Sequence, residues 1–221
     1  MFRRTSMPIS LKTHKDKLTI QLQTLTSGFN RHLTVSAGQR ILDRAAVREG
    51  LVSALWQSWG KFFRSVVLTS ASGGTTAAGA AITCTYVGLT EAQILFVAKQ
   101  LAVGASISTV KSISGSHLEP TWGDINKAMA IVSGMGTSNS GQLLSALSLS
   151  SAIPDLQLCR NASAHFGLSQ LAQLKAARVR YADTMIRHPT DACLWIDPAT
   201  HGYLWDTWVD EMKLVADFAC A

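Results

Sequence analysis

One short segment of the chain combines a cation, an amide and an imidazole: Cys159–Gly167 has the sequence CRNASAHFG. On a helix, Asn161 and His165 share a face because they are one turn apart, and Arg160 lies about 100° further round. An imidazole exchanges a proton near neutral pH, while a guanidinium holds a phosphate group through two N–H bonds. We therefore expect phosphodiester chemistry, with His165 as acid or base and Arg160 stabilising the charge that builds at phosphorus.

The cluster provides one histidine, whereas in-line cleavage of a phosphodiester prefers both a base and an acid. A two-fold dimer that brings two copies of the cluster together would supply both, so we expect a homodimer. We expect Asn161 to position His165 or to bind a phosphate oxygen. The chain has 20 Lys and Arg against 14 Asp and Glu, a net charge of +6 that favours a polyanionic partner.

The same residues resemble the R-x4-6-H signature of the HEPN superfamily, the nucleotide-binding domains of higher eukaryotes and prokaryotes. The common form of that signature is R-N-x-x-A-H followed by glycine. Here Arg160, Asn161, Ala164 and His165 match it, and a phenylalanine stands between the histidine and the glycine. The resemblance covers only this motif. It implies a HEPN-like helical bundle that dimerises so that both motifs line one cleft.

The resemblance implies an activity as well as a fold. Members of the superfamily cleave RNA without a metal or another cofactor, through attack by the ribose 2′-hydroxyl, and many are toxins or antiviral-defence effectors. We therefore expect a metal-independent endoribonuclease. Because a toxic activity needs restraint, we also expect a regulatory partner protein, either an antitoxin or an activator.

Other interpretations of the cluster stay open. In the main alternative, the chain is a non-catalytic helical module that binds RNA or a protein, and the motif is structural. His165 is then a hydrogen-bonded histidine between packed helices, and Arg160 interacts with the dipole at a helix end. The Asn-Ala-Ser sequence at Asn161 is also a glycosylation sequon, which requires secretion. A third alternative is a small-molecule enzyme that uses the Gly/Ser/Thr-rich loop near Gly73.

Charged residues elsewhere are candidates for supporting roles. Glu49 and Arg48 lie among apolar neighbours in a predicted helix. They either orient the side chains of Arg160 or His165 or form a solvated or interhelical ion pair. Basic residues also follow the cluster along the chain: Lys175, Arg178, Arg180 and Arg187. On a helix they form either an RNA-binding face or a solvated one.

Cysteine and histidine spacing argues against a metal site. Zinc-compatible residue types occur at Cys159, His165, Cys193 and His201, but their spacing matches no common zinc site, so no metal is expected. The cysteines are far apart without a CxxC pair, which predicts buried free thiols. The basic N-terminus has no apolar segment behind it, and the chain lacks a run of about 18 apolar residues. We therefore expect a cytoplasmic protein without a membrane span.

The elements that would position these residues are predominantly helical. The chain has 221 residues, of which 47% are hydrophobic and 15% charged, enough apolar content to bury a core. We expect an all-α fold, with a flexible basic arm over residues 1–10 and a single HEPN-like helical domain over residues 11–221. Apolar periodicity predicts helices over residues 11–33, 39–68, 91–103, 168–188 and 203–221, and one around 125–132.

One region departs from helical periodicity. Residues 70–90 are rich in Gly, Ser and Thr, which predicts a loop, and the stretch near Thr83 has a strand-like composition. A second strand-like stretch, CLWID, covers residues 193–197. We expect the two stretches to pair as a short two-stranded β element. Trp56 and Trp59, at helical spacing, are expected in the core or in a dimer interface.

Overall fold

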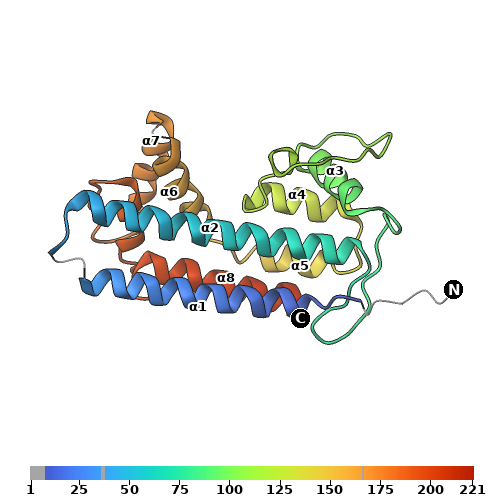
Figure 1. Cartoon of the computed structure of the whole chain (residues 1–221), viewed down its shortest axis with the longest axis horizontal. Coiled ribbons are helices and arrows are strands. Elements are labelled where there is room, and N and C mark those ends of the chain that lie inside the picture. Colours follow the sequence, from blue (N-terminus) through green and yellow to red (C-terminus); the bar gives the residue numbers. More distant parts are fainter. Residues whose placement is uncertain (1–7, 36–37, 166) are drawn as a thin grey trace. The chain divides into compact units, whose positions relative to one another are not determined.

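The computed structural model of the chain describes residues 8–35, 38–165 and 167–221. These residues form an all-α protein (Figure 1), as the sequence predicts. The helices, with short 3-10 helices labelled η, are α1 (Leu11–Val35), α2 (Ile41–Ala71), α3 (Glu91–Ala102), η2 (Ser116–Leu118), α4 (Ile125–Met135), α5 (Ser140–Leu147), α6 (Ile153–His165), α7 (Leu168–Ala177), η3 (Arg178–Arg180), η4 (Pro189–Leu194) and α8 (Leu204–Cys220). Within the described ranges, no helix has both the length and the apolarity needed to cross a membrane.

The chain divides into two compact units. Unit 1 contains residues 61–148 and 216–221 with the described part of residues 1–17, and unit 2 contains residues 18–60 and 149–215. Helices α3, α4 and α5 belong to unit 1, whereas α6, α7 and η4 belong to unit 2. The residues of α1, α2 and α8 are divided between the two units. The cluster around Arg160 therefore lies in unit 2.

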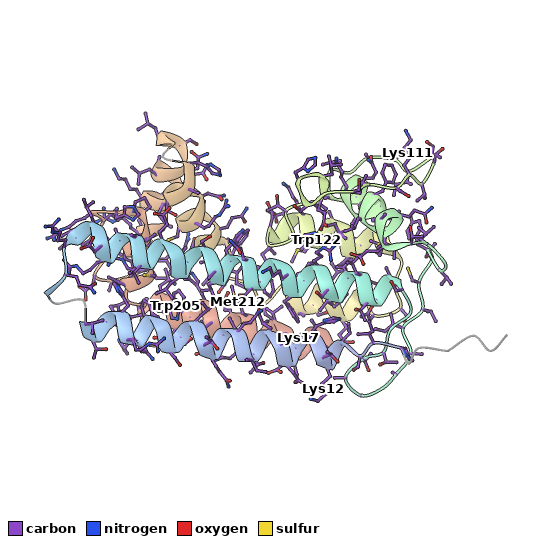
Figure 2. The ribbon with its side chains drawn as sticks, in the orientation of Figure 1. Lys12, Lys17, Lys111, Trp122, Trp205 and Met212 are labelled. Atoms are coloured by element: carbon purple, nitrogen blue, oxygen red, sulfur yellow. The ribbon has the colours of Figure 1, made fainter. Side chains whose placement is uncertain are left out.

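The core of unit 2 is aromatic. Phe29 of α1 stacks on Trp205 of α8, with ring centroids 4.7 Å apart and ring planes 8° from parallel. Phe29 also meets Tyr203 in an edge contact at 5.9 Å. Trp205 and Met212, which Figure 2 labels on α8, are both fully buried. Stacked and edge contacts of this kind stabilise a core beyond the area that they bury.

Helix α2 is continuous through two glycines, Gly50 and Gly60. Its apolar face buries Trp56 and Trp59, which confirms the core as their predicted place. The predicted start and end of this helix differ from the observed ones by two or three residues, which is the usual uncertainty of helix boundaries. Packing of this apolar face, rather than local propensity, holds the helix together across the glycines.

Gly50 gives a testable prediction about α2. A Cβ atom added at Gly50 meets no heavy atom within 4 Å, so we expect Gly50→Ala to raise the free energy of unfolding by about 0.5–1 kcal/mol. Gly74→Ala is the contrasting variant and should lower the free energy of unfolding, because its Cβ would lie 2.4 Å from Thr69 Cγ2 and 2.7 Å from the Ile9 carbonyl oxygen. Urea denaturation measures both changes. A loss of stability at Gly50 would contradict this account of α2.

In unit 1, the N-terminal residues join the Gly/Ser/Thr-rich loop. The Thr75 amide donates to the Ile9 carbonyl at 3.0 Å, and the Ser10 hydroxyl donates to the Thr76 carbonyl at 3.2 Å. Residues 1–7 of the predicted basic arm lie outside the described residues. The loop predicted over residues 70–90 begins where α2 ends, at Ala71, and continues up to α3.

The strand-like stretches form isolated bridges instead of a two-stranded element. Cys84 bridges Thr137 in unit 1, while Ile196 bridges Ala182 and Tyr203 in unit 2. Each stretch therefore takes its backbone partners from its own unit, and the pairing predicted between them is not confirmed. Part of CLWID is not extended at all, because η4 includes its first two residues.

The helix predicted over residues 168–188 is too long. Helix α7 ends at Ala177, η3 follows, and Asp183 adopts a left-handed conformation with φ of 48°. The amide and carbonyl of Ala182 pair with those of Ile196, at 2.8 and 3.0 Å. These long-range backbone bonds replace the helical ones that the apolar pattern predicts.

Candidate functional site

Helix α6, which carries the Arg160 cluster, is fixed at its N-terminus by Glu211 of α8. The Glu211 carboxylate accepts hydrogen bonds from the amides of Ser151 at 3.1 Å, Ala152 at 2.8 Å and Ile153 at 3.1 Å. These amides have no partner within the helix, and a negative charge there also interacts favourably with the helix dipole. Glu211 therefore sets where α6 begins and attaches that end of the helix to α8.

One face of α6 is buried, and the cluster lies beyond it. The helix buries Leu156, Cys159 and Ala162. It packs on α7, as Figure 1 shows, and on η4. Arg160 and Asn161 are half-buried, and His165, the last residue of α6, is exposed. The buried part of α6 also includes polar Asp155 and Ser163, whereas the cluster residues occupy half-buried and exposed positions.

A local hydrogen bond joins two members of the cluster, Arg160 and Asn161. Arg160 Nη1 donates to Asn161 Oδ1 at 3.1 Å. Among the described residues, neither Arg160 nor His165 forms an ion pair with a carboxylate. Phe166, which follows the motif, lies outside the described residues. A guanidinium oriented by an amide and an exposed imidazole are therefore available to a ligand.

Cys159, next to the cluster, is not a nucleophile. Its side chain is fully buried, and its Sγ donates to the Pro189 carbonyl at 3.5 Å. Burial raises the pKa of Cys159 well above its usual value, and nearby Cys193 and Asp191 raise it further. The thiol is therefore protonated at neutral pH. All four cysteines are free and buried, as the sequence predicts.

Arg48 contacts other groups than the cluster. It is 5% exposed, and its Nη2 forms an ion pair with Asp191 Oδ1 of η4 at 2.6 Å. Its Nη1 lies 3.5 Å from His32 Nε2 of α1. Glu49 is half-buried, and the described part of the chain provides no ion-pair partner for its carboxylate. Arg48 therefore forms an interhelical ion pair with Asp191. The sequence left open whether Arg48 forms an ion pair or orients the cluster.

The basic residues after the cluster do not share one helical face, because α7 ends before three of them. Lys175 is exposed on α7, and Arg178 and Arg180 lie in η3. Arg178 Nε donates to the Thr184 hydroxyl at 3.3 Å. Arg187 is exposed in the segment before η4. The prediction of a continuous helical face is therefore wrong, and Lys175 and Arg178 are the members nearest in sequence to the cluster.

Arg180 is engaged by a buried carboxylate. Asp155, in the first turn of α6, has a side chain that is only 2% exposed and pairs with Arg180 Nη2 at 2.5 Å. The Tyr181 hydroxyl donates to the other carboxylate oxygen, also at 2.5 Å. Burial raises the pKa of Tyr181, and its hydrogen bond to Asp155 raises it further. These contacts attach the segment after α7 to the start of α6.

Tyr181 tests this second attachment of α6. Tyr181→Phe removes one hydrogen bond to a buried carboxylate, which we expect to lower the free energy of unfolding by about 1–3 kcal/mol. Tyr86→Phe is the control, since Tyr86 is half-buried in unit 1 and its hydroxyl has no hydrogen bond among the described contacts. Urea denaturation distinguishes them. Equal stability of the two variants would contradict the role of Tyr181.

Each unit contains a cavity. In unit 1, a cavity of about 480 Å³ is lined by Gly73 and Gly74 of the loop, together with His14 and Thr69. His14 Nε2 lies 2.8 Å from Thr69 Oγ1, and burial lowers the pKa of His14, with a further contribution from Lys17. The alternative of a small-molecule site near Gly73 thus has a cavity, and it stays a prediction.

In unit 2, a cavity of about 260 Å³ is lined by Arg44, Arg48 and Arg187, and we call it the arginine pocket. Its lining does not include the cluster residues. The sequence predicts separate supporting roles for Arg48 and Arg187 and gives no signal for Arg44. The structure brings all three guanidinium-bearing residues to one cavity.

No metal site is apparent in the described ranges, where no group of three or more His, Cys, Asp or Glu is arranged to hold an ion. Cys159 and Cys193 are buried in unit 2, while His165 and His201 are exposed. In comparisons with family models, curated proteins and solved structures, nothing matches this chain.

Proposed function

We propose that the chain is a metal-independent endoribonuclease whose active site is built from Arg160, Asn161 and His165 of two copies. The observation that carries the proposal is the arrangement at the end of α6. There a guanidinium held by an amide and an exposed imidazole are free of acidic partners in the described part of the chain. The net charge of +6 also favours association with a polyanion.

In the proposed reaction, His165 of one copy accepts the proton of a ribose 2′-hydroxyl. The 2′ oxygen attacks the adjacent phosphorus, and the bond from phosphorus to the 5′ oxygen breaks. The same histidine of the second copy donates a proton to the leaving 5′ oxygen. The products are a 2′,3′-cyclic phosphate and a 5′-hydroxyl, so no water or metal enters this step.

Arg160 and Asn161 act on the phosphate in this scheme. The Arg160 guanidinium donates to the non-bridging oxygens, where negative charge builds in the pentacovalent state. Asn161 Oδ1 accepts from Arg160 Nη1 at 3.1 Å, so its role is to orient the guanidinium before substrate binds. This role is proposed beside the two expected from the sequence, positioning of His165 and binding of a phosphate oxygen.

The proposed biological setting is toxicity or antiviral defence in the cytoplasm, under the control of a partner protein. Four free cysteines fit a reducing compartment. Control by a partner fits an activity that is harmful to its own cell. Co-expression with a cognate inhibitor, or activation by one component of infected cells, would identify that partner.

The experiment is cleavage of an end-labelled structured RNA by the purified chain in EDTA, with analysis of the new ends. We expect 2′,3′-cyclic phosphate ends, and we expect a strand with 2′-deoxyribose at each cut position to resist cleavage. Cleavage that requires a divalent metal, or that proceeds at the deoxy positions, would contradict the proposed reaction. Binding of the RNA to the protein without cleavage would favour the alternative of a non-catalytic binding module.

A further inference from the structure

We propose that the arginine pocket of unit 2 binds a phosphate monoester, at a site separate from the Arg160 cluster. The pocket is a cavity of about 260 Å³. Its lining includes two arginines of α2 and one from the segment before η4. The inference does not depend on the proposed nuclease activity. It follows from the ion pairs of these arginines: Arg48 has a carboxylate partner, whereas Arg44 and Arg187 have none among the described residues.

The arginine pocket has an excess of positive charge, because its acidic residues are fewer than its arginines. Three arginines line it against two aspartates, Asp183 and Asp191. Both oxygens of Asp191 are already engaged: Oδ1 pairs with Arg48 at 2.6 Å, and Oδ2 accepts from the amides of Arg187 at 2.7 Å and His188 at 2.8 Å. Oδ2 thus already accepts two hydrogen bonds and Oδ1 accepts one from Arg48, and in the described part of the chain no ion pair joins Asp191 to the guanidinium groups of Arg44 or Arg187.

Arg44 and Arg187 have no ion pair within the described residues. Arg44 stands one turn before Arg48 on α2, and like charges at this spacing repel each other. In addition, Nε of Arg44 and Nε of Arg48 are buried without a hydrogen-bond partner. A buried donor without a partner is costly, and Arg48 as a whole is 5% exposed. An anion in the pocket would relieve the repulsion.

The neighbouring histidine experiences the same excess of positive charge. His32, 5% exposed, lies 3.5 Å from Arg48. Burial lowers the pKa of His32, and the charges of Arg48 and Arg44 lower it further. Because a nearby anion favours the protonated imidazole, binding in the pocket would raise the pKa of His32. His32 is thus a built-in reporter of occupancy.

The chemistry of the pocket favours a phosphate monoester over other anions. A monoester carries close to two negative charges and three acceptor oxygens at neutral pH, which suits several guanidinium forks. A phosphodiester inside an RNA strand has a single charge and two such oxygens. The pocket also has an apolar part formed by Ile41, Met185 and Leu194, of which Ile41 is 49% and Met185 64% exposed. These side chains would contact the organic group of the monoester.

Two sources supply this chemistry, a free nucleoside monophosphate and the 5′-phosphorylated end of an RNA strand. Calorimetry on the full chain distinguishes them with four probes: adenosine 5′-monophosphate, adenosine, and a 2′-O-methyl oligonucleotide with and without a 5′-phosphate. The 2′-O-methyl groups prevent cleavage, so failure of the nuclease proposal does not affect this assay. We expect the phosphorylated member of at least one pair to bind and its unphosphorylated counterpart to bind about tenfold more weakly or not at all.

The variants are chosen to leave the fold intact. Arg44→Gln and Arg187→Gln each remove a guanidinium that has no ion pair among the described contacts, and we expect each to weaken binding of the phosphorylated probe about tenfold. Arg31→Gln, an exposed arginine of α1 outside the pocket lining, is the matched control. In NMR titrations, the ring signal of His32 should titrate at higher pH when the phosphorylated probe is bound.

Binding that is confined to adenosine monophosphate assigns the pocket to a free nucleotide, and binding confined to the phosphorylated oligonucleotide assigns it to a strand end. Either outcome, with loss in the Arg44 and Arg187 variants, supports the proposal. Absence of phosphate-dependent binding, or binding that both variants retain at the parental affinity, would overturn it.

Discussion

His165→Ala lowers the rate of RNA cleavage by about a thousandfold or more, because the scheme uses this residue as both acid and base and each role contributes a factor of roughly 10²–10⁴. The fold should not change. His165 is exposed at the last position of α6, and exposed substitutions of this kind shift the free energy of unfolding by less than about 0.5 kcal/mol. Single-turnover cleavage in EDTA measures the rate, and urea denaturation measures the stability.

His117→Ala is the matched control for this loss. His117 is an exposed histidine of η2 in unit 1, so its removal should leave both cleavage and stability at the parental values. A His165→Ala variant that cleaves RNA at the parental rate would remove the imidazole from the mechanism. The cluster would then be structural.

Asp191→Ala has the largest expected effect on stability, a loss of about 3–5 kcal/mol in the free energy of unfolding. The substitution leaves the buried guanidinium of Arg48 without the carboxylate that lies 2.6 Å away. It also removes the acceptor for the amides of Arg187 and His188 at the start of η4. Urea denaturation monitored by circular dichroism measures the change.

Two further variants separate the causes of this loss. Asp183→Asn removes an exposed negative charge of the same pocket and should have little effect, because asparagine tolerates the left-handed backbone conformation at this position. In the double variant Arg48→Met with Asp191→Asn, no unpaired charge is buried and an acceptor for the η4 amides remains. We expect that variant to recover most of the lost stability. An Asp191→Ala variant as stable as the parent would contradict the role of the buried pair.

The long helices were predictable from sequence because their apolar residues recur at helical spacing over many turns. Helices α2 and α8 end within three residues of their predicted limits. The prediction was wrong after Ala177, where the apolar pattern continues but the backbone turns. There Arg180 and Tyr181 bind Asp155, more than 20 residues earlier in the chain, and a local pattern contains no information about such a partner.

The candidate site divides in the same way. The spacing of Arg160, Asn161 and His165 predicted a helical cluster, and the structure places all three on α6. The partner of Arg48 was not predictable by spacing, since Asp191 is 143 residues away. A local signal did exist: a proline in the first turn, followed two residues later by an aspartate, is typical of a helix start. The side chain of Asp191 caps the backbone there. The signal predicts the cap but not the arginine.

The measurement that tests the central claim most directly is the cleavage rate in EDTA across mixtures of parental and His165→Ala chains. If two copies build one site, only dimers of two parental chains are active, so the rate falls with the square of the parental fraction, to about a quarter in an equal mixture. A linear fall, to about a half, would contradict a composite site. Absence of cleavage by the parental chain alone would contradict the proposed activity.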